Sequence, residues 1–132
     1  MYIMKPPRIG GYVNPHQDNT YIMSSPASTI GFWVAIDDAG PENACMYGVP
    51  GSHKHGTKKY WRKTETGMAN TEEVEYETEG SICLEAKAGT VVFFHGDFVH
   101  YSGINTSKKE RHAYTLHIVE TENTTWRSDN WL

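Results

Sequence analysis

Short runs of β-branched and aromatic residues recur along this chain, separated by clusters of Gly, Pro, Asn and Asp. This pattern is typical of strands joined by turns, and no segment shows the period of about 3.6 residues that an amphipathic helix requires. The sequence therefore predicts an all-β fold. We expect strands at eight places: Tyr2–Lys5, Tyr12–Ile22, Ile30–Asp37, Cys45–Val49, Ser81–Glu85, Thr90–Phe94, Val99–Ser102 and Ala113–Glu120.

The segments between these runs have the chemistry of turns. Ser25-Pro26, Pro50-Gly51-Ser52 and Gly96-Asp97 each combine residues that favour a tight change of direction. About eight short strands at this spacing fit a double-stranded β-helix, the cupin-like jelly roll in which two sheets pack face to face. The chain has 132 residues, which predicts one domain over 1–132.

The stretch 55–80 differs from the rest of the chain because it is polar, rich in Glu and poor in apolar residues. Its composition predicts a long surface loop or lid. Loops of this length inside a compact domain are uncommon, and they tend to be functional or disordered. A solvated acidic loop without a function is the simpler interpretation.

Charge and hydropathy exclude several classes of partner. The chain has 12 Lys and Arg against 16 Asp and Glu, a net charge of −4, so it lacks the basic surface that neutralises a nucleic-acid backbone. The longest apolar runs, at 30–36 and 91–94, are far shorter than the roughly 20 residues of a membrane helix. The first residues resemble neither a secretory signal nor a transit peptide. We therefore expect an intracellular, cytoplasmic protein in which Cys45 and Cys83 are reduced thiols.

Two of the seven histidines begin a His-x-Asp triplet. In both His16-Gln17-Asp18 and His95-Gly96-Asp97, positions i and i+2 of a strand would point to one face and could bind one ion. Such a short motif also arises by chance. Spacing alone therefore leaves both triplets open as metal ligands and as ordinary hydrogen-bonded histidines.

A further histidine and an arginine follow the second triplet. The apolar run at 91–94 leads through that triplet to His100, and Arg111 lies eleven residues further on. Two histidines and one carboxylate on one face of a β-roll would form the facial triad of non-haem Fe(II) oxygenases, which leaves positions on the metal open. The guanidinium of Arg111 can anchor a carboxylate through two parallel hydrogen bonds, as the distal carboxylate of 2-oxoglutarate would require. The alternative for Arg111 is a surface ion pair with Glu110 or Glu120.

Short blocks of residues spread over almost the whole chain carry a family resemblance. The blocks are Met1–Pro6, Pro15–Asp18, Trp33–Ala39 with Glu42-Asn43, Val49–His53, Ala88–Gly96, His100–Ser102, Asn105–Ser107, Arg111–His117, Thr124–Trp126 and Asn130–Leu132. In content, order and spacing they resemble the phytanoyl-CoA dioxygenase family of Fe(II)- and 2-oxoglutarate-dependent oxygenases.

This resemblance implies an iron site and a co-substrate site. It implies that His16, Asp18 and His100 bind Fe(II), which assigns the triplet at 95–97 to a structural turn. The residues that it places around 2-oxoglutarate are Arg111 and Ser102 at the distal carboxylate, Trp33 beside the co-substrate, and Met1 and Gln17 in the same pocket. O2 and a small-molecule substrate of unidentified class would complete the reaction.

The activity implied by the resemblance is a dioxygenase that couples oxidative decarboxylation of 2-oxoglutarate to hydroxylation of a C–H bond. Asp18 favours a hydroxylase, because the halogenating relatives lack this carboxylate. The resemblance also implies a partly helical N-terminal region that has no counterpart in these 132 residues. A non-catalytic metal-binding module or an inactive fragment is therefore one alternative, and a cupin-type isomerase is another.

Overall fold

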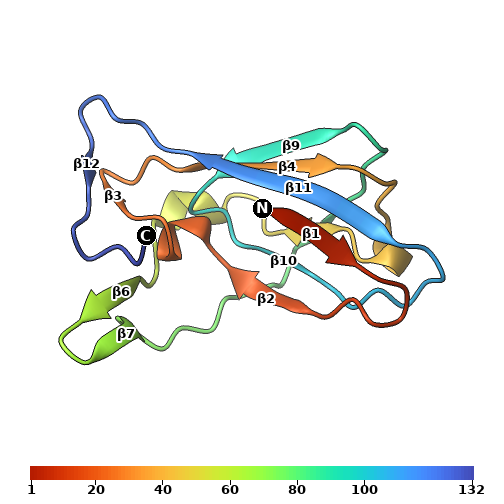
Figure 1. Ribbon diagram of the computed structural model, residues 1–132, viewed down its shortest axis with the longest axis horizontal. Coiled ribbons are helices and arrows are strands. Elements are labelled where there is room, and N and C mark those ends of the chain that lie inside the picture. Colours follow the sequence, from red (N-terminus) through yellow and green to blue (C-terminus); the bar gives the residue numbers. More distant parts are fainter.

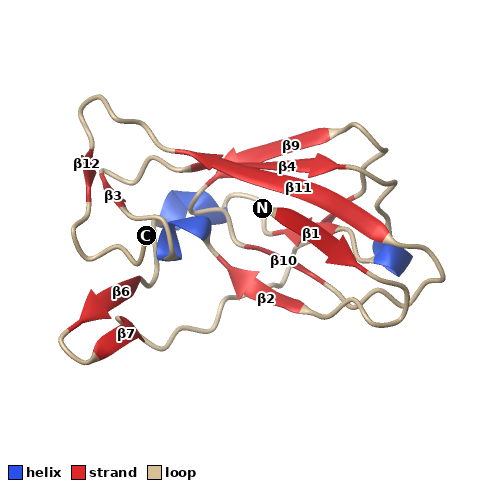
Figure 2. Ribbon diagram, viewed as in Figure 1, coloured by secondary structure: helices blue, strands red, loops and turns tan.

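The computed structural model describes residues 1–132, which form strands, turns and short 3-10 helices (Figure 2). The strands are β1 (Tyr2–Lys5), β2 (Val13–His16), β3 (Ser24–Ser25), β4 (Ile30–Ala35), β5 (Met46–Gly48), β6 (Trp61–Thr64), β7 (Gly67–Asn70), β8 (Ile82–Leu84), β9 (Val91–His95), β10 (His100–Ser102), β11 (Arg111–Ile118) and β12 (Thr125–Trp126). The 3-10 helices are η1 (Asp18–Thr20), η2 (Pro41–Asn43) and η3 (Ser52–His55).

Two four-stranded antiparallel sheets form the body of the molecule. The larger sheet has the order β1-β11-β4-β9, and the smaller sheet has the order β2-β10-β5-β8. Apart from the step from β5 to β8, successive strands of these sheets alternate between the two layers, as in a double-stranded β-helix. Figure 1 shows the larger sheet above β10 and β2 of the smaller one. The expected all-β jelly roll is confirmed.

The core lies between the inner faces of the two sheets. Along β4, half-buried and buried residues alternate, so that Gly31, Trp33 and Ala35 take the buried positions. Ala35 pairs with Ala113 of β11 across the larger sheet. Trp33, Ala35 and Ala113 pack in one cluster with Met46 of the smaller sheet. Strand alternation therefore decides which side chains reach the interior.

Cys45 and Cys83 meet beside this core. Their Sγ atoms are 2.9 Å apart, and both residues are free thiols. Burial raises the pKa of the Cys45 thiol to about 12, so that Cys45 is protonated at neutral pH.

The eight expected strands correspond to the eight strands of the two sheets, with differences at their ends. The largest difference concerns Tyr12–Ile22, where β2 ends at His16 and η1 follows. The backbone turns there because the amides of Tyr21 and Ile22 both donate to the carbonyl O of Asp18. β11 begins earlier than expected, at Arg111.

The stretch 55–80 is not a single loop, which corrects the expectation for it. It contains a hairpin in which β6 and β7 pair from Trp61 and Asn70 to Thr64 and Gly67. Gly67 has a φ of 133° in the turn, a conformation that other residues rarely adopt. Most residues of the hairpin are exposed, and neither strand alternates apolar with polar side chains over its length, so the sequence lacks the pattern by which strands are recognised.

The outer face of the larger sheet is apolar. Large exposed side chains take alternate positions on three of its strands, and they are Tyr2, Met4, Val91, Phe93, Tyr114, Leu116 and Ile118. Positions that alternate along a strand point to the same face, so these side chains lie opposite the core. Separately, none of the helices has the length and hydropathy needed to span a membrane.

Candidate metal site and the cavity beside it

Three residues that the sequence analysis singled out come together at one place. His16 ends β2 and His100 begins β10, and the two are direct partners in the smaller sheet. Asp18 follows in η1, and Gln17 before it keeps an extended backbone. Strand alternation therefore continues past the end of β2 and brings Asp18 to the side of His16. Ligand atoms of His16, Asp18 and His100 lie within 4.8 Å of one another.

Both histidines turn the same ring nitrogen towards the carboxylate. Nδ1 of His16 lies 2.8 Å from the carbonyl O of Asn14, and Nδ1 of His100 lies 2.9 Å from that of Phe98. A carbonyl only accepts, so each Nδ1 carries the hydrogen and each Nε2 keeps its lone pair. Each Nε2 lies 3.8 Å from Oδ1 of Asp18. Two ligands of one ion are at most about 4.2 Å apart when each bond is about 2.1 Å long, so these two histidine–carboxylate spacings suit a shared ion.

The charge states of the cluster suit a cation. Burial lowers the pKa of His100 to about 4, so its ring is neutral at neutral pH. Burial of Asp18 opposes ionisation, but the hydrogen bond from His117, with a smaller electrostatic contribution from the nearby histidine rings, outweighs burial and holds the pKa of the carboxyl below its usual value. A neutral imidazole and an ionised carboxylate are the forms that bind metals.

Gly31 of β4 makes room for Asp18. A Cβ at position 31 would lie 2.8 Å from Oδ2 of Asp18 and 2.8 Å from the ring of Phe94. Both distances are shorter than van der Waals contact, so any side chain here would push the carboxylate away. The site therefore depends on a residue without a side chain as well as on its polar groups.

A cavity of about 430 Å³ opens beside the cluster. Its polar lining residues are His16, Asp18, His100, Ser102, Arg111, Thr115 and His117. Most of the other lining residues are apolar, including Trp33. β10 exposes one face to this cavity, because His100 and Ser102 are buried on the same side of the strand.

Arg111 is buried beside this cavity, with 2% of its surface exposed. The alternative of a surface ion pair is therefore excluded. Nε and Nη2 donate to the carbonyl O of Ala44 over 3.0 and 2.7 Å, while Nη1 is buried without a partner. The guanidinium carbon lies 5.5 Å from the centre of the Trp33 ring. An unpaired buried N–H is costly, and an anionic ligand in the cavity would satisfy it.

Met1 and Gln17, expected in the same pocket, lie in different places. Met1 lines the cavity, and its carbonyl O accepts a hydrogen bond of 2.7 Å from the amide of Thr115. Gln17 is fully buried but does not line the cavity. The alternation that brings His16 and Asp18 to the cavity turns Gln17 away from it, which corrects the expectation for this residue.

The side chain of Gln17 instead joins two neighbouring loops. Nε2 donates to the carbonyl O of Gly56 over 2.9 Å and to that of Asp97 over 2.7 Å. Oε1 accepts a hydrogen bond of 2.9 Å from the amide of Lys58. Gln17 therefore holds the segment after η3 against the turn that follows β9.

The second triplet, at 95–97, forms that turn. Oδ1 of Asp97 accepts hydrogen bonds from the Asn19 amide group at 2.8 Å and from the Thr57 hydroxyl at 2.5 Å. The amide of Asp97 donates to Nδ1 of His95 over 3.0 Å. Because Asn19 belongs to η1, Asp97 supports the segment that carries Asp18.

One residue of the site received no role from the sequence. His117 of β11 lines the cavity, and its Nε2 lies 3.0 Å from Oδ2 of Asp18. It follows Arg111 by six residues, and an even spacing places both residues on one face of a strand. The contact joins positions 99 residues apart, so no local pattern reveals it.

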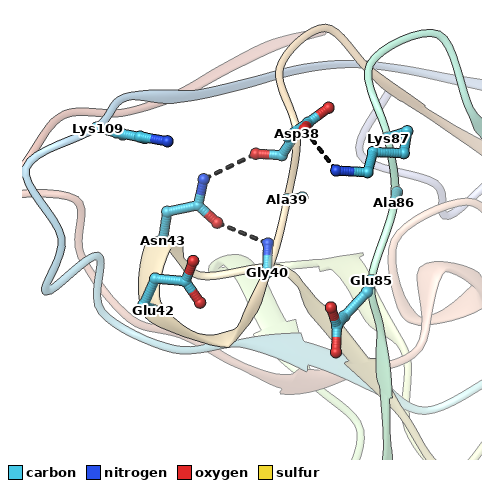
Figure 3. Close-up of a pocket in the computed structure, with 9 residues that line it drawn as sticks. All are labelled: Asp38, Ala39, Gly40, Glu42, Asn43, Glu85, Ala86, Lys87 and Lys109. Carbon is cyan, nitrogen blue, oxygen red and sulfur yellow. Dashed lines mark hydrogen bonds and ion pairs between the residues drawn. The ribbon is translucent and has the colours of Figure 1, made fainter.

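A second hollow, of about 340 Å³, shares no lining residue with the first (Figure 3). Lys87 Nζ pairs with Oδ2 of Asp38 at 2.9 Å. The Asn43 side chain accepts from the amide of Gly40 and donates to the carbonyl O of Asp38, over 2.7 Å each. These polar groups satisfy one another, and we assign no ligand to this hollow.

A double-stranded β-helix that carries two histidines and one carboxylate beside open space has the arrangement of the non-haem iron oxygenases. The family model described as phytanoyl-CoA dioxygenase (PhyH) matches residues 1–113 of the chain. The chain therefore belongs to the phytanoyl-CoA dioxygenase family.

Curated relatives agree with this assignment. A phytanoyl-CoA dioxygenase of Arabidopsis thaliana is 41% identical over 133 residues, which cover 100% of this chain and 47% of the relative. The phytanoyl-CoA dioxygenase domain-containing protein 1 of Danio rerio is 42% identical over 138 residues, with the same two coverages of 100% and 47%. The chain thus spans about half the length of the curated relatives it matches.

Solved structures show the same fold. The apo form of the non-haem monooxygenase ThoJ superimposes with a TM-score of 0.74 at 22% identity, over 95% of this chain and 46% of that one. EvdO2 from Micromonospora carbonacea var. aurantiaca, complexed with 2-oxoglutarate, gives a TM-score of 0.70 at 23% identity, over 98% of this chain and 53% of that one.

Proposed function

We propose that this chain is an Fe(II)- and 2-oxoglutarate-dependent dioxygenase that hydroxylates a small, largely apolar molecule. One observation carries the proposal: the cluster of His16, Asp18 and His100 and the buried, partly unpaired Arg111 line the same cavity. A metal ion alone gains nothing from a cationic side chain nearby, whereas a carboxylate co-substrate needs one. Membership of the phytanoyl-CoA dioxygenase family supports the same activity.

The donor set of the cluster fits Fe(II). His16 and His100 would bind it through Nε2, and Asp18 through Oδ1, because these are the atoms that converge. Two imidazoles and one carboxylate leave the remaining positions of the metal open. When bound, the iron supplies the activation of O2 and the oxidation of the C–H bond.

The buried groups around Arg111 fit the distal carboxylate of 2-oxoglutarate. Nη1 of Arg111 would donate to this carboxylate, since it has no other partner. Ser102 would add a hydroxyl donor from β10, and the flat Trp33 side chain would pack beside the carbon chain. The hydrogen bonds to Ala44 keep the guanidinium in place for this contact.

The rest of the cavity fits an apolar substrate. Its apolar lining includes Ile3, Val13, Met46 and Phe94. Such a wall excludes water and contributes affinity for hydrocarbon surface, while the few polar groups fix the position of the ligands.

Anaerobic titration of the Fe(II)-loaded protein with 2-oxoglutarate tests the proposal. Bidentate binding to Fe(II) produces a weak visible charge-transfer band, which we expect for the wild-type chain. Asp18→Ala should abolish the band, because iron is no longer held. Arg111→Ala should weaken 2-oxoglutarate binding about 10–100-fold at unchanged iron affinity, since it removes a charge-assisted hydrogen bond. The matched controls His55→Ala and Arg62→Ala change exposed residues and should behave as wild type.

The absence of a band in a folded, iron-loaded protein would contradict the co-substrate site and support a non-catalytic metal-binding module. If the band forms, the release of succinate from 2-oxoglutarate distinguishes the dioxygenase from a cupin-type isomerase, which consumes no co-substrate. Unchanged 2-oxoglutarate affinity in Arg111→Ala would remove the role assigned to Arg111.

A further inference from the structure

The two oxygens of Asp18 have different partners. Oδ1 lies 3.8 Å from Nε2 of both His16 and His100, the two ring nitrogens that converge on the proposed metal position. Oδ2 lies 3.0 Å from Nε2 of His117. One oxygen of the carboxylate therefore faces the histidine pair of the smaller sheet, and the other is held by β11 of the larger sheet.

Two neighbouring strands of the larger sheet fix this orientation. His117 of β11 and Gly31 of β4 are direct partners in the strand pairing. Oδ2 of Asp18 occupies the space that a side chain at position 31 would fill, because a Cβ there would lie 2.8 Å away. Gly31 thus provides the room for Oδ2, and His117 provides its hydrogen-bond donor.

His117 carries its hydrogen on the opposite ring nitrogen from His16 and His100. An ionised carboxylate only accepts hydrogen bonds, so Nε2 of His117 is the donor to Asp18. Nε2 of His16 and His100 instead keeps its lone pair, because Nδ1 donates to a backbone carbonyl. The nitrogen of His117 that faces Asp18 therefore has no lone pair for a metal, and His117 is not a ligand through this atom.

We propose that His117 is a positioning residue, which holds Oδ2 so that Asp18 offers only Oδ1 to the metal. The inference rests on the proposed metal site. A carboxylate that binds through one oxygen leaves more positions of the metal open to 2-oxoglutarate and O2 than one that binds through both. Hydrogen-bond partners of metal ligands typically contribute 10–100-fold to metal affinity.

Titration with Mn(II), followed by the EPR signal of the free ion, tests this role without turnover. His117→Phe keeps a ring and removes the donor, and we expect it to bind Mn(II) about 10–100-fold more weakly than wild type. His117→Gln places an amide N–H close to the position of Nε2 and should restore most of the affinity. The matched control His112→Phe changes a histidine on the opposite face of the same strand and should bind Mn(II) as wild type does.

The outcomes separate this inference from the proposed function. If wild type binds Mn(II) tightly and His117→Phe binds it equally well, His117 has no positioning role although the metal site stands. If His117→Gln binds as weakly as His117→Phe, loss of the donor is not the cause, and the inference fails. If wild type binds no better than Asp18→Ala, the proposed metal site itself is wrong.

A second measurement needs no variant that could fail to fold. Long-range 1H–15N NMR spectra of the metal-free wild type report which ring nitrogen of each histidine carries the hydrogen. We expect the Nε2–H form for His117 and the Nδ1–H form for His16 and His100. The Nδ1–H form at His117 would overturn the proposal, because that ring could not donate to Asp18.

Discussion

Arg111 is fixed by a backbone carbonyl where a carboxylate would have been the more usual partner. Both Nε and Nη2 donate to the carbonyl O of Ala44, which is neutral. Burial lowers the pKa of Arg111, but a guanidinium remains charged at neutral pH. Because no acidic side chain neutralises it, the positive charge stays available to an anion in the cavity. Because its partner is a neutral carbonyl, Arg111 can still bind an anionic ligand. A carboxylate partner would stabilise the ligand-free protein more but would compete with that ligand.

At position 31, adding one methyl group should disrupt the site. Gly31→Ala places a Cβ 2.8 Å from Oδ2 of Asp18, so the carboxylate or β4 must shift. We expect a loss of about 1–3 kcal/mol in the free energy of unfolding, together with weaker Mn(II) binding. Urea unfolding and the Mn(II) titration check the two effects. The control Gly11→Ala meets no atom within 4 Å and should change neither quantity; wild-type Mn(II) affinity in Gly31→Ala would contradict the close packing around Asp18.

Strand alternation explains which single residues could be placed from the sequence. It brings His16 and Asp18 to one side, although Asp18 lies beyond the end of β2. The same rule turns Gln17 to the opposite side, so the family resemblance was a poorer guide to this residue than its position. The role of His117 needs the pairing of β11 with β4, which is a property of the folded sheet. The carbonyl of Ala44 that holds Arg111 has no signature in the sequence.

At the scale of elements, the end of β1 is tied to loops next to the smaller sheet. Lys5, the last residue of β1, is buried, and its Nζ donates to the carbonyl O of Gly11 over 2.8 Å and to that of Gly103 over 2.6 Å. The Asn105 side chain donates to the carbonyl O of Lys5 over 2.8 Å. These bonds join β1 to segments next to β2 and β10, so Lys5 links the two sheets.

This link should make stability depend on pH in a narrow alkaline range. Burial and the charge of Arg111 lower the pKa of Lys5 to about 8, whereas an unfolded chain has an ordinary lysine. Above pH 8 the unfolded state therefore binds more protons than the folded state, and the free energy of unfolding should rise with pH. Burial raises the pKa of Cys45 and of Tyr47 to about 12, which acts in the opposite direction above about pH 9.

Urea unfolding of wild type and Lys5→Met at pH 7.5, 8, 8.5 and 9 isolates this contribution. The free energy of unfolding of wild type should increase relative to that of Lys5→Met across this range. Parallel pH profiles would mean that Lys5 has the same pKa in the folded and unfolded states.

The elements that the sequence predicted are those that bury one face. Six of the eight strands of the two sheets place apolar residues in or against the core, and this is the signal that a pattern detects; β2 and β10 instead turn polar residues to the cavity. β6 and β7 pair with each other in a mostly exposed hairpin, so nothing selects apolar residues there. β3 and β12 are two residues long, which is too short for a period. Their pairing follows from the path of the chain around the roll.

For the whole molecule, the two faces of the larger sheet have different roles. Its inner face carries Trp33, Arg111 and His117, so it contributes both to the core and to the cavity. Its outer face is apolar without being buried, and Phe93 there is 71% exposed. Apolar side chains contribute to stability only when they leave water, so the two faces should contribute very differently to folding.

Alanine substitutions on the two faces test this division. Trp33→Ala removes a side chain that is 4% exposed and should cost about 3–5 kcal/mol, a large part of the roughly 5–15 kcal/mol that stabilises a typical domain. Phe93→Ala removes an exposed ring and should change the free energy of unfolding by less than about 0.5 kcal/mol. Urea unfolding followed by circular dichroism measures both values. A cost above about 2 kcal/mol for Phe93→Ala would require burial of that ring in solution, and sedimentation of wild type and Phe93→Ala would then show whether a second copy of the chain buries it.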